Sequence, residues 1–426
     1  MIVFTFRGRP IFARGKAMVA YTYYIQQQDV IYSNKMKESI HIQNFGPLRD
    51  VRIDDIKPLT VLIGDSASGK STIMKVVALM RYIYKRANIY SYLKNAGVSD
   101  RSRSFINLIG EMQPMLTDET KINYTVHMPN GGNYTYLFDR DGRQFDDIGI
   151  NKADMVFFKE AFVAETRSMI PTWSLYGARF PGADLGYYFN ETFRDFSEAT
   201  DRIKEQSLDY LDMKMEVKTE PTRKHFLISP NDGSREVFEL EHTSSGIQAS
   251  VPLMTIMRYF AHEFSFTNAF RRSILDQLAD GDITRFRPEV SLQDLKKYVH
   301  IYIEEPELSL DPQTQYLFMK DLIREAFYRG DNKRPDDGRQ LGLMFATHSP
   351  YIPNYINVLL KASYFKQARE CYPYINEDEI VAYRMEKGEI ELLMATDNRS
   401  GRHFINTMDL SDTMELIYDE YRSIKK

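Results

Sequence analysis

The 426-residue chain has one cysteine, no long apolar run and little excess of either charge. Because a disulfide needs two thiols, the lone Cys371 excludes an internal disulfide and favours a reducing, cytoplasmic location. No stretch approaches the ~20 apolar residues of a membrane span, so we expect no membrane segment. A net charge of −4 excludes a general electrostatic attraction to nucleic acid.

Heptad repeats and large basic patches are also lacking. No heptad run is long enough for a coiled-coil arm, which excludes a long-armed architecture. The basic clusters at 81–86, 101–103 and 271–272 are small, and we interpret them as solvated faces, although DNA contact through a local patch stays open. The hydrophobic content of 43% is ample for a core, so the length predicts one large α/β domain with a subdomain, or two domains.

A complete G-x-x-x-x-G-K-[ST] motif lies between a predicted strand over 59–63 and a predicted amphipathic helix over 72–83. Its glycines let backbone N–H groups surround phosphates, and the helix N-terminus adds its positive dipole end. Lys70 would reach the β- and γ-phosphates, and the Ser71 hydroxyl would bind Mg²⁺. The predicted nucleotide-binding residues are Gly64, Asp65, Ser66, Ala67, Ser68, Gly69, Lys70, Ser71 and Thr72.

Two carboxylates and a histidine follow two other apolar strands. Glu304 and Glu305 come directly after the predicted strand 299–303, where a Mg-ATP hydrolase needs acids. We assign Glu304 to the metal and Glu305 to the general base that polarises the attacking water. His348 follows the predicted strand 341–346, where it could meet a γ-phosphate or orient the water. The predicted catalytic residues are Glu305, His348 and Lys70.

A Ser-Ser-Gly segment provides a second candidate anion site. Ser244 and Ser245 precede a predicted helix over 246–266, which Gly246 begins, and hydroxyls and a glycine at a helix start favour anion binding. A helix cap with this composition is common. The position of the segment in the sequence, between the phosphate loop and the acidic strand, favours the anion site over a simple helix cap.

The remaining pattern completes an α/β fold. Further strands are predicted at 39–45, 51–53, 121–128, 133–138, 154–164 and 379–384, and helical patterns at 185–235 and 313–328. Residues 1–35 have no clear period and precede Met36, so we treat them as an N-terminal extension whose status the sequence leaves open.

In this order the motifs resemble the ATP-binding-cassette class of ATPase heads, in the branch of RecF, the structural-maintenance-of-chromosomes (SMC) proteins and the OLD-like proteins. Asn-Phe-Gly-Pro-Leu at 44–48, Ile-Glu-Glu-Pro-Glu at 303–307 and Thr-His-Ser-Pro at 347–350 are typical of the AAA-type OLD-like ATPases. The resemblance implies a mixed central sheet with an antiparallel β subdomain and a helical signature subdomain. The implied division is 36–165 for the phosphate-loop and β subdomain, 166–297 for the signature subdomain and 298–426 for the lobe with the acidic strand and histidine.

The resemblance also implies roles in a dimer. Ser244, Ser245 and Gly246 correspond to the signature motif, which contacts the γ-phosphate of ATP bound to a second subunit. Residues 309–311 correspond to the D-loop and His348 to the switch histidine. Two ATP molecules would then lie between Lys70 of one chain and Gly246 of the other. Gln113 is the candidate for the expected Q-loop glutamine.

The sequence departs from the motif pattern of related ATPases at three points. Glu304 replaces the metal-binding aspartate of transporters, and an insertion around 268–297 separates the signature from the acidic strand. The segment after His348 is too short for the Toprim nuclease domain of OLD proteins and has no Asp-x-Asp pair. We therefore expect any effector, a nuclease or a toxin, to be a separate chain.

Three functions follow from these expectations. The first is the ATPase sensor or regulator of a bacterial anti-phage defence system, resembling the stand-alone ATPase subunits of Septu and PARIS. The second is a RecF-like DNA repair clamp, which the weak net charge disfavours. The third is a non-enzymatic scaffold, which the intact Glu305 disfavours. We expect a cytoplasmic homodimer or higher homo-oligomer that uses ATP and Mg²⁺.

Overall fold

A large mixed sheet forms the centre of the protein. The computed structural model describes residues 35–408 except 99–109, 140–142, 145–148, 177–184, 222, 234–235, 279–281, 283–284 and 328–336, together with residues 4–6, 9–11, 420 and 422. The sheet has the strand order β8-β7-β6-β3-β4-β17-β16-β5-β15-β14-β9. Its strands are β3 (Lys37–Phe45), β4 (Leu48–Ile53), β5 (Leu59–Gly64), β6 (Lys121–His127), β7 (Asn133–Phe138), β8 (Arg143–Gln144), β9 (Val156–Val163), β14 (Lys296–Glu304), β15 (Gln340–Thr347), β16 (Ile380–Glu386) and β17 (Glu389–Leu392).

The strands of one half of this sheet run parallel and those of the other half run mainly antiparallel. β16, β5, β15, β14 and β9 are parallel neighbours, whereas β3, β4, β6, β7 and β8 pair antiparallel. Nearly every residue of β5, β14 and β15 is buried, as expected for parallel strands with both faces covered. The expected mixed sheet with an antiparallel β part is therefore confirmed.

Helices cover the sheet. They are α2 (Lys70–Asn95), α3 (Ile170–Tyr176), α4 (Tyr187–Arg202), α5 (Ser245–Arg258), α6 (Phe266–Leu275), α8 (Pro312–Phe327), α9 (Tyr351–Ser363) and α10 (Lys366–Cys371), with the short turns η2 (Gly110–Met115), η4 (Glu165–Met169) and η8 (Tyr259–Glu263). α2 continues beyond the predicted end at residue 83 and stops before Gly97, whose left-handed φ of 82° suits a helix C-terminus. No helix in the described ranges combines the length and apolarity needed to cross a bilayer.

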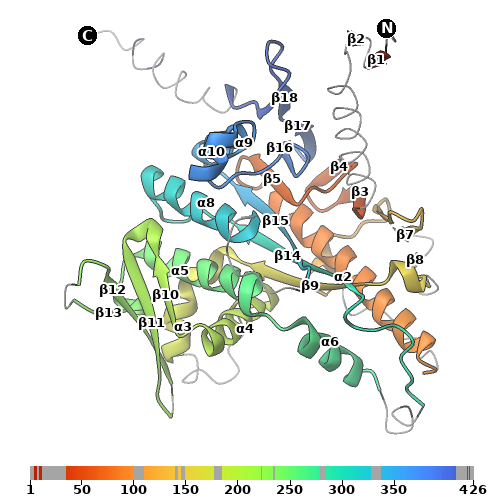
Figure 1. Cartoon of the computed structure of the whole chain (residues 1–426), viewed down its shortest axis with the longest axis horizontal. Helices are drawn as coiled ribbons and strands as arrows, with labels where there is room; N and C mark the ends of the chain where they lie inside the picture. The colour runs from red at the N-terminus through yellow and green to blue at the C-terminus, as the bar shows by residue number, and fades with distance from the viewer. Residues whose placement is uncertain are drawn as a thin grey trace, which may run out of the picture.

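The helical pattern predicted for 185–235 is wrong in its second half. The described part of this range has the α-helix α4 and the single 3₁₀ turn η6 (Asp209–Leu211). A second sheet follows α4, consisting of β10 (Glu205–Leu208), β11 (Met213–Thr219), β12 (Lys224–Pro230) and β13 (Phe238–Glu239). Met215 and Val217 of β11 are buried and alternate with exposed charged residues. This period of two outweighs the helix propensity of Met, Lys and Glu. Figure 1 shows the small sheet on the opposite side of the molecule from β7 and β8.

Two short hairpins lie outside the two larger sheets. The hairpins pair β1 (Phe4–Phe6) with β2 (Arg9–Ile11) and β18 (Met394–Thr396) with β19 (His403–Ile405).

The predicted insertion at 268–297 lies against α2. It contributes part of α6, whose Phe270 ring packs edge-on against Tyr92 of α2, with ring centroids 4.9 Å apart. This segment therefore supports the far end of the phosphate-loop helix.

A buried ion pair joins α2 to the sheet. Arg81 donates from Nε and Nη2 to the two carboxylate oxygens of Glu38 on β3, at 2.9 and 2.6 Å, and from Nη1 to the Tyr302 hydroxyl at 3.1 Å. Burial raises the pKa of Glu38, but the charge and hydrogen bonds of Arg81 outweigh burial and lower it to about 2. The basic cluster at 81–86 is thus not simply a solvated face, whereas Arg271 and Arg272 are exposed. The cluster at 101–103 lies outside the described residues.

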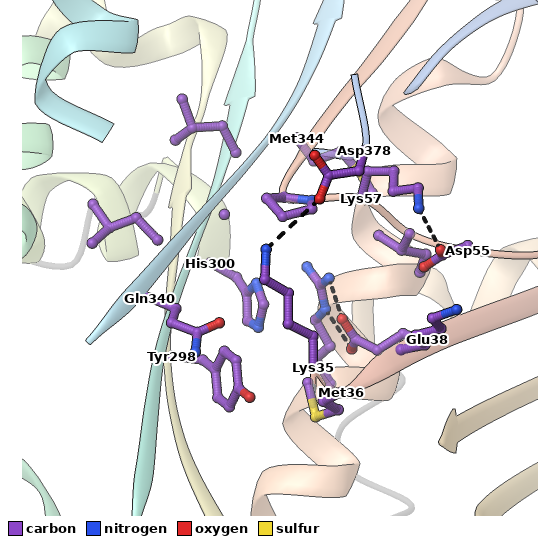
Figure 2. Close-up of a pocket in the computed structure, with 17 residues that line it drawn as sticks. Lys35, Met36, Glu38, Asp55, Lys57, Tyr298, His300, Gln340, Met344 and Asp378 are labelled. Atoms are coloured by element: carbon purple, nitrogen blue, oxygen red, sulfur yellow. Dashed lines mark hydrogen bonds and ion pairs between the residues drawn. The ribbon is translucent and has the colours of Figure 1, made fainter. Parts of the chain in front are cut away.

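A cavity of about 110 Å³ lies beside this pair. Figure 2 shows Lys35, Glu38, Tyr298, His300 and Asp378 among the residues around it. The residues of β14 and β15 that line it lie mainly in the amino-terminal halves of these strands, with Met344 near the middle of β15. The cavity is therefore at the opposite edge of the sheet from the phosphate loop, which follows the carboxyl end of β5.

We predict that Arg81→Met lowers the free energy of unfolding by about 3–5 kcal/mol, because it leaves the Glu38 carboxylate buried without its cation. The double variant Arg81→Met/Glu38→Met should recover most of the loss, since no buried charge then remains. Urea unfolding followed by circular dichroism measures both. An Arg81→Met protein as stable as the wild type would contradict the structural role of the pair.

Candidate nucleotide-binding and catalytic site

Three predicted functional segments meet at one edge of the sheet. The phosphate loop follows β5, Glu305 follows β14 and His348 follows β15, and these strands are parallel neighbours in the order β5-β15-β14. The register places Thr347 level with Ile63 and Glu304 level with Ala346. Carboxyl ends of adjacent parallel strands form the ligand-binding edge of α/β sheets. The three segments were predicted separately, and the hydrogen-bonded register brings them together.

The phosphate loop has the close packing that its glycines allow. Gly64 and Gly69 have φ of 153° and 105°. A Cβ at residue 64 would lie 2.4 Å from the carbonyl oxygen of Met385, and one at residue 69 would lie 2.6 Å from Cδ2 of Leu48. Any other residue would displace the loop. Leu48, the first residue of β4, therefore supports the loop from outside the motif.

Lys70 is held by the loop itself. Its Nζ donates to the carbonyl oxygens of Gly64 at 2.8 Å and Asp65 at 2.7 Å, and to the Ser68 hydroxyl at 3.3 Å. Burial lowers the pKa of Lys70, while the charges of Glu305 and Asp65 act in the opposite direction. Gly69 provides the N-cap of α2 without a side-chain hydrogen bond, so the first backbone N–H groups of the helix are not capped by a side chain.

Glu305, His348 and Lys70 form a chain of polar contacts. Nε2 of His348 lies 3.4 Å from Oε1 of Glu305, and Nδ1 lies 3.5 Å from Nζ of Lys70. Burial raises the pKa of Glu305, the charge of His348 opposes this, and the charges of Glu307 and Glu165 add to it. A raised carboxylate pKa suits a general base that works near neutral pH. All three predicted catalytic residues therefore lie together.

Glu304, the predicted metal ligand, lies at the carboxyl end of β14. Its side chain is buried, and Oε2 accepts a hydrogen bond of 3.3 Å from the backbone N–H of Glu165. A carboxylate and the Ser71 hydroxyl match the oxygen ligands that Mg²⁺ prefers, with phosphates and waters completing its octahedron. No group of three or more His, Cys, Asp or Glu side chains in the described ranges could hold a metal without such help. The donor set therefore fits a nucleotide-bound Mg²⁺.

Glu307 holds the histidine loop against the acidic turn. Its Oε1 accepts hydrogen bonds from the Thr347 hydroxyl at 2.7 Å and from the backbone N–H groups of His348 and Ser349 at 2.9 and 3.1 Å. Glu307 belongs to the predicted acidic motif, but the sequence offered no role for it. Its contacts fix the backbone of His348 relative to Glu305.

Arg167, which the sequence did not single out, is the largest fully buried side chain at this edge. It lies in η4 after β9 and donates to the carbonyl oxygens of Glu304 at 2.6 Å and Glu305 at 2.5 Å. It also donates to the carbonyl oxygens of Ala164 at 3.1 Å and Ala249 at 3.0 Å. A basic residue just after a buried strand was the only local signal, and such residues are usually exposed.

The signature segment begins α5 next to the D-loop of the same chain. Ser244 is the N-cap without a side-chain cap bond, and Ser244 and Ser245 are exposed. Gly246 is buried, and a Cβ there would lie 2.6 Å from the carbonyl oxygen of Ser309. Within the described residues, no hydrogen bond joins this segment to the phosphate loop of its own chain. Its binding role therefore stays a prediction.

Gln113 lies close to the turn between β3 and β4. It is exposed in η2, whose neighbour Met115 accepts a backbone hydrogen bond of 2.9 Å from Gly46. Thr117 and Thr120 add hydroxyl hydrogen bonds to the carbonyl oxygen of Asn44. η2 is thus docked on the β3–β4 turn, and the Q-loop role of Gln113 stays a prediction.

A comparison with protein families matches the segment around the phosphate loop. Residues 36–90, which contain the phosphate loop, match the family model described as an AAA ATPase domain. This match supports an ATPase of the AAA type. A comparison with curated proteins gave no match.

Solved structures similar to this chain include two SMC heads and RecF. The SMC head domain from Thermotoga maritima is 12% identical, with a TM-score of 0.32, over 84% of this chain and 98% of that chain. The SMC head domain bound to the C-terminal domain of ScpA, from Pyrococcus furiosus, is 10% identical, with a TM-score of 0.32, over 91% and 100%. RecF of the RecFOR pathway is 10% identical, with a TM-score of 0.33, over 84% and 99%. These values are too low to assign a function.

Proposed function

We propose that this chain binds and hydrolyses Mg-ATP at the edge formed by β5, β15 and β14. The observation that carries the proposal is the contact chain from Lys70 through His348 to Glu305, beside the buried Glu304. Lys70 exchanges the loop carbonyls for the β- and γ-phosphates. Ser71 and Glu304 would hold Mg²⁺, which when bound would supply positive charge beside the phosphates.

Glu305 and His348 carry out the hydrolytic step. Glu305 accepts a proton from a water molecule whose oxygen forms a bond to the γ-phosphorus, while the bond from that phosphorus to the bridging oxygen breaks. ADP and inorganic phosphate are the products. His348 orients the water or contacts the γ-phosphate, and Glu307 keeps the histidine in place through its backbone hydrogen bond.

The site is completed by a second copy of the chain. Ser244 and Ser245 are exposed at the start of a 14-residue helix, and no hydrogen bond in the described part of the chain ties them to their own phosphate loop. A helix N-terminus with free hydroxyls suits the γ-phosphate of a partner's ATP. The dimer is therefore head-to-head, with each ATP between a phosphate loop and a signature segment.

In the cell, this ATPase acts as the sensor or regulator of an anti-phage defence system with a separate effector. Support for this role is the resemblance of the motifs at 44–48, 303–307 and 347–350 to those of stand-alone OLD-like ATPases. The alternative is a RecF-like clamp. ATP-dependent retention on duplex DNA by the Glu305→Gln protein would favour the clamp, whereas ATP-dependent release or activation of a co-encoded effector would favour the defence role.

Lys70→Ala should weaken ATP binding by about 10–100-fold, because a charge-assisted hydrogen-bond donor to the phosphates is lost. Isothermal titration with a slowly hydrolysed ATP analogue measures the affinity. Lys75→Ala is the matched control, since Lys75 lies on the next turn of α2 with its ammonium 4.5 Å from the Tyr188 ring centroid. Equal affinities of Lys70→Ala and the wild type would refute the phosphate role of Lys70.

Glu305→Gln should retain ATP binding and lower kcat by about 10²–10⁴-fold, because the amide cannot accept the proton of the water. With Mg-ATP, its native mass by light scattering should double if ATP drives dimerisation. A mass that is larger than one chain and unaffected by ATP would point to a preassembled complex. Hydrolysis at the wild-type rate would show that Glu305 is not the base.

Ser245→Trp should lower kcat by roughly 100-fold, because the bulky side chain separates the two nucleotide-binding surfaces. It should leave ATP affinity of the isolated chain unchanged and prevent the ATP-induced mass increase of the Glu305→Gln protein. Ser245 is preferable to Gly246, where any Cβ would collide with Ser309 of the same chain. Ser400→Trp, on an exposed turn, is the control. Unchanged kcat in Ser245→Trp would argue against action across the dimer.

A further inference from the structure

The contacts of Arg167 are unusual for a buried arginine. The side chain has no solvent exposure, and each of its described hydrogen bonds goes to a backbone carbonyl oxygen. Buried arginines are ordinarily paired with carboxylates. Burial lowers the pKa of Arg167 to about 10, with the acids around it opposing the shift, so the guanidinium keeps its charge at neutral pH.

Two of these carbonyls belong to the turn that carries the catalytic acids. Arg167 binds the carbonyl oxygens of both Glu304 and Glu305. Glu305 has a φ of 45°, a left-handed conformation that is unfavourable for a non-glycine residue. Its backbone N–H donates to Ala346 on the other side, at 2.9 Å. The backbone of Glu305 is therefore held from both sides in a conformation it would not adopt alone.

The same guanidinium also holds the signature helix. Its Nε donates to the carbonyl oxygen of Ala249, one turn into α5. Earlier in α5, Gly246 lies against the carbonyl oxygen of Ser309, a few residues after Glu305. α5 is thus joined to the acidic segment at two points. A shift of α5 cannot occur without moving Arg167 or Ser309.

We propose that Arg167 is a positioning residue that couples α5 to the general base of the same chain. The inference rests on the proposed ATPase function and deepens it. When Ser244 and Ser245 engage ATP bound to the partner copy, the shift of α5 passes through Arg167 to the backbone of Glu305. Each chain then adjusts its own base according to the nucleotide on its partner. Hydrolysis at the two sites of the dimer is coupled as a result.

The test compares Arg167→Met and Arg167→Lys with Arg339→Met. Arg339 is the control for loss of a buried guanidinium, because it is also buried and donates to the carbonyl oxygens of Phe260 and Phe264, away from the acidic turn, although it also pairs with the Asp337 carboxylate. Arg167→Met should lower kcat by about 100-fold with unchanged ATP affinity, since the base is displaced while the phosphate loop is intact. Arg167→Lys, a point charge without the planar fork, should give an intermediate kcat. Arg339→Met should keep the wild-type kcat.

Hydrogen exchange in the Glu305→Gln background provides a readout that does not depend on hydrolysis. ATP should slow exchange at the start of α5 and at residues 304–309. With Arg167→Met added, ATP should still protect α5 but no longer residues 304–309. Retention of both protections would overturn the coupling.

The other outcomes are equally decisive. Wild-type kcat in Arg167→Met, or equal losses in Arg167→Met and Arg339→Met, would overturn the proposal. If Arg167→Met does not fold, Arg167→Lys decides: a reduced kcat with normal ATP affinity supports the coupling, and a wild-type kcat overturns it. A wild-type chain that binds ATP without hydrolysing it would instead overturn the proposed function, and the coupling with it, before any variant is compared.

Discussion

The parallel register of β5, β15, β14 and β9 is the constraint on which the site depends. Residues far apart along the chain become neighbours because Ile63, Thr347 and the ends of β14 and β9 lie level at one edge. A slip of one strand by one residue would move every side chain of that strand to the opposite face of the sheet, against helices packed for different side chains. The positions of Lys70, Glu305 and His348 are therefore consequences of how the core packs.

Around this edge, cationic side chains bind the backbone of their own chain. Lys70 binds loop carbonyls and Arg167 binds those of the acidic turn. Lys70 and Arg167 differ in whether another ligand can replace their carbonyl partners. Lys70 lies in the phosphate loop, where phosphate oxygens can replace its carbonyl partners, whereas Arg167 is enclosed and keeps its partners. The first arrangement suits ligand binding, and the second suits transmission of movement between α5 and Glu305.

Sequence pattern predicted the strands around the phosphate loop, the acidic strand and the histidine strand well, because each is a short apolar run between turn signals. It failed over 205–230, where Met, Lys and Glu favour a helix but alternate with the period of a strand. It also treated Arg81 as part of a solvated face. The pairing of Arg81 with Glu38 comes from two elements that are distant in sequence, and local pattern has no access to such a contact.

The sequence by itself determined which chemical groups are present in which local pattern: a G-x-x-x-x-G-K-[ST] loop, two acids at the end of an apolar run, a histidine after another, and hydroxyls before a helix. These are local features, since each depends on residue types within a few positions of one another. Only the tertiary structure decided that Glu307 holds the histidine loop, that Gly246 packs on Ser309 and that Arg167 joins α5 to the acidic turn. Each of these contacts joins segments that are separate in the sequence, and their geometry is set by the packing of the whole core.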